Sequence, residues 1–176
     1  MNNSDVYQIV GYKNSGKTSL ICRLIHLYTE QGKQVAVIKH DGHSFEADPQ
    51  GSDTHRLRDA GAAWSAITSN ERTAIVMETA ASIGDLINEA PLHDLLLVEG
   101  FKQERYPKLV LIRDEKDEAL ACRLHSVTAV AVWPNYIKIL DPMKLPAGTA
   151  IFEIDDTLAI AEHIMTTIAK ERLSVF

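Results

Sequence analysis

Cysteine, long apolar runs and clustered basic residues are all scarce in this chain of 176 residues. Cys22 and Cys122 are too few and too far apart for a disulfide framework, so we expect core thiols in a reducing compartment. No stretch approaches the roughly 20 apolar residues that a membrane span needs, and no basic segment followed by an apolar one opens the chain. The net charge of −6 argues against broad binding to nucleic acid or to membrane surfaces. Together these features predict a cytoplasmic protein with neither nucleic acid nor membrane as a partner.

Strand-like and helix-like segments alternate along the chain, which is typical of an α/β fold with a mostly parallel central sheet flanked by helices. The length and the apolar content of 45% suit a single domain over residues 1–176. Strands are expected at 6–10, 35–38, 64–68, 73–77, 95–98, 109–112 and 127–132, with a hairpin turn at 70–72. Helices are expected from 17 to the stop at Gly32, at about 52–60, around 83–87, and after a cap at Asp155 or Asp156.

Residues 11–18 read Gly-Tyr-Lys-Asn-Ser-Gly-Lys-Thr and match the P-loop pattern G-x-x-x-x-G-K-[ST]. The preceding strand and the following amphipathic helix are the context that this motif requires. Its glycines let backbone N–H groups converge on an anion, while Lys17 supplies a charge to the β- and γ-phosphates and Thr18 a hydroxyl to Mg²⁺. For Lys13, a solvated loop position is the alternative to a phosphate contact. We therefore expect a P-loop NTPase fold in which the nucleotide is held by Gly11, Lys13, Asn14, Ser15, Gly16, Lys17 and Thr18.

A carboxylate opposite the P-loop is needed to complete the magnesium shell, and two carboxylates flank the most apolar strand, at 95–98. Ligands of open α/β sheets bind beyond the carboxyl ends of the strands. Glu99 follows the strand at that end, whereas Asp94 lies at the other end, about 15 Å away at about 3.3 Å per residue. Glu99 is thus the expected catalytic residue and, with Thr18, the expected metal ligand. A solvated charge at the end of a strand is the alternative.

The segment 39–61 gathers charged and histidine side chains after the second predicted strand, which should end at the same edge as the P-loop. Asp53 and Arg56 are three residues apart on a predicted helix and should share a face, whereas Arg58 should point elsewhere. The segment could sense the nucleotide, bind a second anionic ligand, or bind a transition metal through His40 and His43; a solvated polar loop is the remaining alternative. The side chains concerned are Lys39, His40, His43, Asp48, Asp53, Arg56 and Arg58.

Three segments together resemble a family. They are the P-loop, the stretch from Lys39-His40 to Arg56-Leu57-Arg58-Asp59-Ala60-Gly61-Ala62, and Val98-Glu99-Gly100-Phe101-Lys102. The chain is similar along essentially its whole length to the bacterial molybdopterin-guanine dinucleotide biosynthesis adapter, protein B. The resemblance implies a P-loop GTP-binding protein, often homodimeric, with weak Mg²⁺-dependent GTPase activity. It also implies assistance to the guanylyltransferase that joins GMP to molybdopterin, with Asp53 and Arg56 beside the nucleotide site.

The residues by themselves leave the base undecided, because no Asn-Lys-x-Asp guanine-recognition motif is present. Asn135, just after the strand at 127–132, lies where a base-reading loop could be. The resemblance favours guanine over adenine. GTP and Mg²⁺ are therefore the expected ligands, and the guanylyltransferase and molybdopterin the expected partners.

Two other functions compete with an adapter. A small-molecule kinase would use the same phosphate site, but the chain has no separate Arg-rich lid insertion, although the segment 39–61 could hold an acceptor. A nucleotide-gated metal chaperone would use His40 and His43. No glutamine or arginine is evident in the sequence as a water-positioning or charge-stabilising group, so we expect slow hydrolysis.

Overall fold

The computed structural model describes residues 5–42 and 45–174, and the chain divides into two compact units. The first unit lies within residues 1–40 and 87–176, and the second within residues 41–86. The expectation of one domain over residues 1–176 stays a prediction.

The first unit contains a six-stranded sheet in the order β2-β5-β1-β6-β7-β8, and every pairing in it is parallel. β1, which leads into the P-loop, lies between β5 and β6, so residues that follow these strands can reach the same loop. The expected α/β fold with a parallel sheet is confirmed. The strands are β1 (Val6–Val10), β2 (Val35–Lys39), β5 (Leu95–Glu99), β6 (Lys108–Ile112), β7 (Val127–Val132) and β8 (Ala150–Glu153).

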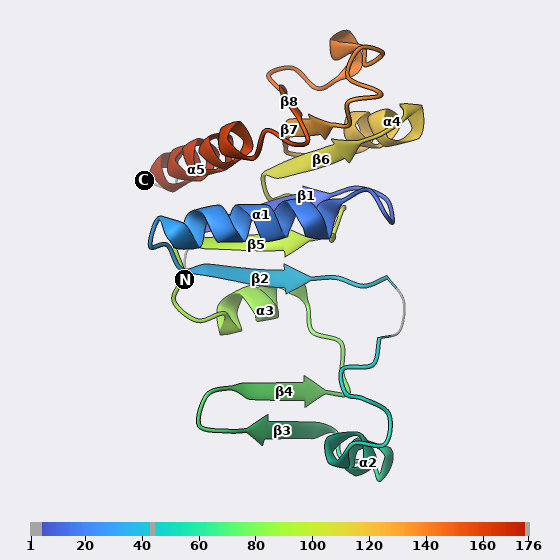
Figure 1. Ribbon diagram of the computed structural model, residues 1–176, viewed down its shortest axis with the longest axis vertical. Coiled ribbons are helices and arrows are strands. Elements are labelled where there is room, and N and C mark those ends of the chain that lie inside the picture. The colour runs from blue at the N-terminus through green and yellow to red at the C-terminus, as the bar shows by residue number, and fades with distance from the viewer. Residues whose placement is uncertain (1–4, 43–44, 175–176) are drawn as a thin grey trace. The chain divides into compact units, whose positions relative to one another are not determined.

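Helices pack on both faces of this sheet, because alternate strand residues point to opposite sides. On one face, Ile9, Leu97 and Leu111 pack against α1 (Lys17–Glu30) and α5 (Thr157–Ser174), which also contact each other (Figure 1). On the other face, Val10 and Val110 belong to a second cluster with residues of α4 (Glu115–Arg123). The P-loop follows β1, an inner strand, at the carboxyl end of the sheet.

The second unit contains the short helix α2 (Asp53–Asp59) and an antiparallel hairpin of β3 (Trp64–Thr68) and β4 (Thr73–Met77). Both strands of the hairpin and its turn lie where the sequence predicts them. Ser69 closes the turn, because its Oγ accepts hydrogen bonds from the N–H groups of Glu71 and Arg72 at 3.2 Å each. The helix α3 (Ile83–Glu89) spans the boundary in sequence between the two units.

One helix, one strand and one short 3₁₀ helix were not expected from the sequence. α4 has acidic residues in its first turn, and two of these, Asp117 and Glu118, are buried, which leaves only a short apolar stripe. β8 has four residues whose burial alternates, so it lacks a continuous apolar run. The segment 142–148, expected as a connector, contains a short 3₁₀ helix, η2 (Pro142–Lys144).

The expectation of core thiols is wrong for both cysteines, since Cys22 and Cys122 are free but exposed. Cys22 lies on α1 next to buried Ile21 and points outward, while the thiol of Cys122 donates to the carbonyl of Lys144 at 3.0 Å. None of the helices in the described part of the chain has the length and apolar content required to cross a bilayer.

Candidate functional site at the end of β1

The P-loop connects β1 to α1 through backbone conformations that depend on glycine. Gly16, the residue before α1, has φ 98°, and a Cβ built on it would lie 3.2 Å from Cζ2 of Trp133. A Cβ on Gly11 would lie 2.7 Å from Oγ of Ser15. Asn14 adopts φ 60°, a left-handed value that Asn accepts better than most residues. No side chain caps the start of α1, so the positive end of the helix faces the loop.

Thr18 and Glu99 meet across the sheet, although 81 positions separate them in the sequence. The hydroxyl of Thr18 donates to Glu99 with distances of 2.9 Å to Oε2 and 3.1 Å to Oε1. Glu99 is buried at the last position of β5, beside β1. Asp94 lies at the opposite end of this strand, where its Oδ2 accepts a hydrogen bond from the N–H of Gln34 at 2.8 Å. The geometry thus places Glu99, and not Asp94, next to the P-loop, as expected.

The ammonium of Lys17 lies among other cations. Its Nζ donates to the carbonyl of Tyr12 at 2.8 Å. Burial lowers the pKa of Lys17; the charge of Glu99 opposes this shift, and Lys102, Lys39 and Arg113 add to it. A concentration of positive charge at the start of a helix attracts anions. Such a site can occur in an acidic chain because the cations come from separate segments of the sequence.

Lys39 and Lys102 bring charge to the site from the ends of neighbouring strands. Nζ of Lys39 lies 3.7 Å from Oε1 of Glu99 and 3.5 Å from the hydroxyl of Thr18. Lys102 lies over the ring of Tyr12, with its Nζ 4.4 Å from the ring centroid, and Lys116 of α4 lies 4.5 Å from the same centroid. Two cations near one P-loop aromatic ring extend the positive surface beyond Lys17.

The loop after Glu99 is held from inside the sheet by two buried polar side chains. Gln8 donates from Nε2 to the carbonyls of Gly100 and Phe101 at 3.0 and 2.8 Å. Lys108 donates from Nζ to the carbonyls of Lys102 and Glu104. Gly100 turns with φ 94°, and a Cβ there would lie 3.2 Å from Cβ of His40. These contacts determine where the backbone on either side of Lys102 runs.

Arg113 and Trp133, which were not expected from the sequence, both touch the P-loop backbone. Nη1 of Arg113 donates to the carbonyl of Asn14 at 3.1 Å, and Nε1 of Trp133 donates to the carbonyl of Ser15 at 3.0 Å. Each residue directly follows a strand, Arg113 after β6 and Trp133 after β7. The rule that identified Glu99, a functional side chain just beyond the carboxyl end of a strand, could have found them.

Asp53 and Arg56 lie on α2, in the second unit, and are both exposed. They share a face, as expected, with Nη1 of Arg56 3.7 Å from Oδ1 of Asp53. Arg58 points elsewhere and forms ion pairs with Glu46, Asp48 and Glu78. The part of Asp53 and Arg56 in nucleotide binding stays a prediction.

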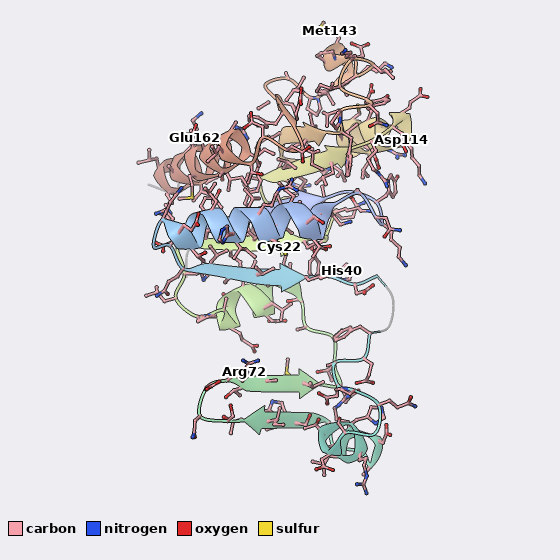
Figure 2. All side chains as sticks on the ribbon, viewed as in Figure 1. Cys22, His40, Arg72, Asp114, Met143 and Glu162 are labelled. Atoms are coloured by element: carbon pink, nitrogen blue, oxygen red, sulfur yellow. The ribbon has the colours of Figure 1, made fainter. Side chains whose placement is uncertain are left out.

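The expected histidine pair is only partly described. His40 follows β2 (Figure 2). Its ring centroid lies 4.4 Å from that of Phe101. His43 falls outside the described residues. Within the described ranges, no group of three or more His, Cys, Asp or Glu side chains is arranged to hold a metal ion. Asn135 is exposed, and its role in reading a base stays a prediction.

Comparisons with known proteins point to one family. The family described as "Molybdopterin guanine dinucleotide synthesis protein B" (MobB) matches residues 6–133. A Haemophilus influenzae relative named "Molybdopterin-guanine dinucleotide biosynthesis adapter protein" is 39% identical over 145 residues, covering 78% of this chain and 82% of its own. A Bacillus subtilis relative named as a probable adapter of the same kind is 33% identical over 162 residues, covering 88% of each chain.

Solved structures agree on the fold. The crystal structure of Bacillus subtilis MobB aligns with a TM-score of 0.76 at 28% identity, covering 93% of this chain and 97% of the other. A MobB homologue from Bacillus stearothermophilus aligns with a TM-score of 0.69 at 29% identity, covering 94% and 99%. The family match includes the P-loop, Glu99, Arg113 and Trp133, and the structural matches extend over nearly the whole chain. The chain therefore belongs to the MobB family of molybdopterin guanine dinucleotide synthesis proteins and has a P-loop NTPase fold.

Proposed function

We propose that this protein is a GTP-binding adapter in the biosynthesis of molybdopterin guanine dinucleotide, where it assists the guanylyltransferase. The observation that carries the proposal is the arrangement of Lys17, Thr18 and Glu99 at the start of α1. The names of the relatives supply the pathway. The carboxylate and the hydroxyl of this arrangement are the groups that P-loop proteins use around Mg²⁺, and the lysine is the one they use for phosphates.

The residues present fit a magnesium nucleotide. The hydroxyl of Ser15 is fully buried and has no hydrogen-bond partner among the described residues, so it is available to a ligand at the P-loop. The ammonium of Lys17 already lies against the loop, where β- and γ-phosphates would take the place of the Tyr12 carbonyl as its partner. Thr18 and Glu99 would hold Mg²⁺, which supplies charge neutralisation at the phosphates when bound.

Hydrolysis by this chain alone is proposed to be slow. Glu99 can orient a water molecule and Lys17 can stabilise charge, but Lys39 competes for the carboxylate of Glu99 at 3.7 Å. P-loop GTPases without an activating partner turn over on the order of 10⁻³ per second or below. A slow intrinsic rate suits an adapter whose nucleotide state is read by another protein.

The proposed partners are the guanylyltransferase and, as a second ligand, molybdopterin, whose phosphate is an anion. The cations around the P-loop, among them Lys39 and Lys102, offer more positive charge than Lys17 alone. A homodimer is proposed from the resemblance to the family. The base is proposed to be guanine, and calorimetric titration with GTP and with ATP in the presence of Mg²⁺ would test this choice.

Reconstitution tests the adapter role. Purified protein, GTP, Mg²⁺, molybdopterin and the guanylyltransferase are mixed, and guanylylated cofactor is measured with and without this chain. The expected result is an increase that is lost with Lys17→Ala and kept with Lys170→Ala, which removes an exposed lysine of α5. Rapid phosphoryl transfer from the nucleotide to a small acceptor by this chain alone would instead support the kinase alternative.

A further inference from the structure

Arg113 occupies a position from which one side chain reaches both α4 and the P-loop. It directly follows β6, the strand beside β1. Its Nε donates to Oδ2 of Asp117 at 2.9 Å, and its own backbone N–H donates to the same oxygen at 3.0 Å. Its Nη1 donates to the carbonyl of Asn14 at 3.1 Å. The guanidinium is a planar fork, so binding Nε on one side restricts where Nη1 can point.

Asp117 is itself fixed by burial and by a hydrogen bond at the start of α4. Its side chain is fully buried in the first turn of α4, and its N–H donates to Oδ1 of Asp114, the cap of that helix, at 3.0 Å. A buried carboxylate requires a charged or hydrogen-bonding partner, and Arg113 is the ion-pair partner that the described residues provide. The pair therefore connects the start of α4 to the phosphate loop.

The contact of Arg113 with the carbonyl of Asn14 influences which way the N–H groups of the P-loop point. In a trans peptide the C=O and the N–H point to opposite sides. Arg113 holds the carbonyl of Asn14, and Trp133 holds the carbonyl of the next residue, Ser15, at 3.0 Å. Two successive peptides are thereby held by their oxygens, and the N–H of the first, that of Ser15, donates to the carbonyl of Tyr12 at 3.3 Å. The N–H that follows the second carbonyl, that of Gly16, then points away from Trp133, toward the side where an anion would bind.

We propose that Arg113, fixed by Asp117, is a positioning residue that holds the P-loop backbone at Asn14, so that the following N–H of Gly16 points toward a bound phosphate. The inference rests on the proposed nucleotide site and adds a residue to it. It differs from a simple effect of charge, because Asp117 contributes to anion binding although it is itself an anion. The contact also supports the left-handed φ of 60° at Asn14, which Asn adopts more readily than most residues but less readily than glycine.

The test compares the affinity of four variants for inorganic tripolyphosphate and for GTP by calorimetry. Arg113→Met and Asp117→Asn should each weaken both ligands by about tenfold, the size expected when a charge-assisted contact is lost. Arg113→Lys keeps the charge but loses the fork, and should resemble Arg113→Met and not the wild-type protein. The control is Arg123→Met, in the last turn of α4, where Nε donates to the carbonyl of Ala119 and the P-loop is not contacted.

A double variant and a spectroscopic signal separate positioning from loss of fold. If the two residues act as one unit, Arg113→Met with Asp117→Asn should bind no more weakly than Arg113→Met alone. Trp64 and Trp133 are the tryptophans of the chain, so Trp64→Phe leaves Trp133 as the fluorophore. In that background, Arg113→Met and Asp117→Asn should shift the emission of Trp133 without any ligand, whereas Arg123→Met should not.

Three results would overturn the inference. The first is an Asp117→Asn variant that binds tripolyphosphate as tightly as the wild-type protein or more tightly, which plain electrostatics predicts. The second is a loss of affinity that unfolding explains by itself. In that case the variants have a lower urea midpoint, and their affinity per folded molecule equals that of the wild-type protein. In the third, wild-type protein binds neither tripolyphosphate nor GTP. Only the third result overturns the proposed function as well.

Discussion

At the scale of single residues, the site depends on a lysine and a carboxylate that lie far apart in the sequence. Lys17 donates to the carbonyl of Tyr12, and Glu99 accepts a hydrogen bond from Thr18 while Lys39 lies 3.7 Å away. Both side chains have partners within the protein, which a nucleotide with Mg²⁺ would replace in the proposed complex. Substituting either side chain should therefore change ligand affinity and hydrolysis more than the stability of the fold.

Lys17→Ala should lower the affinity for GTP about a hundredfold, because a phosphate contact of a partly buried ammonium is worth a few kcal/mol. The fold should persist, since Lys17 is not part of either apolar cluster. Calorimetry measures the affinity and circular dichroism checks the fold, with Lys170→Ala as the control. Unchanged affinity in a folded Lys17→Ala variant would contradict the assignment.

Because burial lowers the pKa of Lys17, we expect the affinity for GTP to depend on pH in the alkaline range. Phosphates favour the ammonium, so the pKa of Lys17 should be higher in the complex than in the free protein. Affinity is then complete below the free-protein pKa and falls as pH rises from that value to the pKa of the complex. Calorimetry in buffers of different ionisation enthalpy should detect proton uptake on binding in that range. The proton uptake should be absent in Lys17→Met.

Glu99→Gln should reduce Mg²⁺-dependent GTP hydrolysis more than it reduces GTP binding. The amide still fills the buried position but loses the charge that holds the metal shell, whereas Lys17 continues to hold the phosphates. Asp94→Asn is the matched control at the opposite end of β5, where Asp94 contacts Gln34. Phosphate release and GTP affinity are measured for both variants. Sensitivity at Asp94 with tolerance at Glu99 would refute the placement of the site.

At the scale of elements, α1 has a glycine with positive φ at each end, and only one of the two lies at the site. Gly16 precedes the helix with φ 98°, and Gly32 follows it with φ 73°. At the C-terminal end, the N–H of Gly32 donates to the carbonyl of Thr29, and that of Lys33 to Tyr28, each at 3.0 Å. This pair of hydrogen bonds is a Schellman motif, which explains why the helix ends where the sequence predicts.

Gly16→Ala and Gly32→Ala should each lower the free energy of unfolding by about 1–2 kcal/mol, because alanine is strained at positive φ. Only Gly16→Ala should also weaken GTP binding, since its Cβ would lie 3.2 Å from Trp133 and displace the P-loop. Around Gly32 no atom lies within 4 Å of an added Cβ. Urea denaturation and calorimetry give the two quantities. Equal effects on affinity would show that the Gly16 junction has no special part in the site.

At the scale of the whole molecule, the hairpin of the second unit exposes large apolar side chains. Trp64, Ile67, Ile75 and Met77 are between 40% and 58% exposed. An isolated two-stranded hairpin is marginally stable in water, and exposed apolar surface of this kind is common at contacts between chains. The hairpin is therefore the surface that we propose for the homodimer, which itself is proposed from the resemblance to the family.

Sedimentation equilibrium should give a mass of twice the 19.5 kDa of the chain. Ile67→Lys and Ile75→Lys should each shift the protein toward the monomer, because a buried lysine at an interface is costly. Ile139→Lys is the control, since Ile139 is 67% exposed and lies outside the hairpin. A monomeric wild-type protein, or a dimer insensitive to both hairpin variants, would exclude this interface.

The sequence was most informative where one local rule decided the structure. The P-loop pattern, the strand that precedes it and the helix that follows it were all predictable, as was the hairpin around Ser69. Glu99 was predictable because the carboxyl ends of parallel strands meet at one edge. α4 escaped prediction because Asp117 and Glu118, acidic in type, are buried through contacts with Arg113 and Tyr136. Local sequence does not encode those partners.

The sequence by itself determined the fold class, the phosphate loop and the choice of Glu99 over Asp94, since each follows from spacing, periodicity and the direction of a strand. The tertiary structure alone decided which distant side chains support the loop. Arg113 and Trp133 lie 99 and 118 positions from the residues whose carbonyls they bind. They meet the P-loop because β6 and β7 follow β1 in the order of the sheet. Strand order comes from the packing of the whole chain, and no short stretch of sequence specifies it.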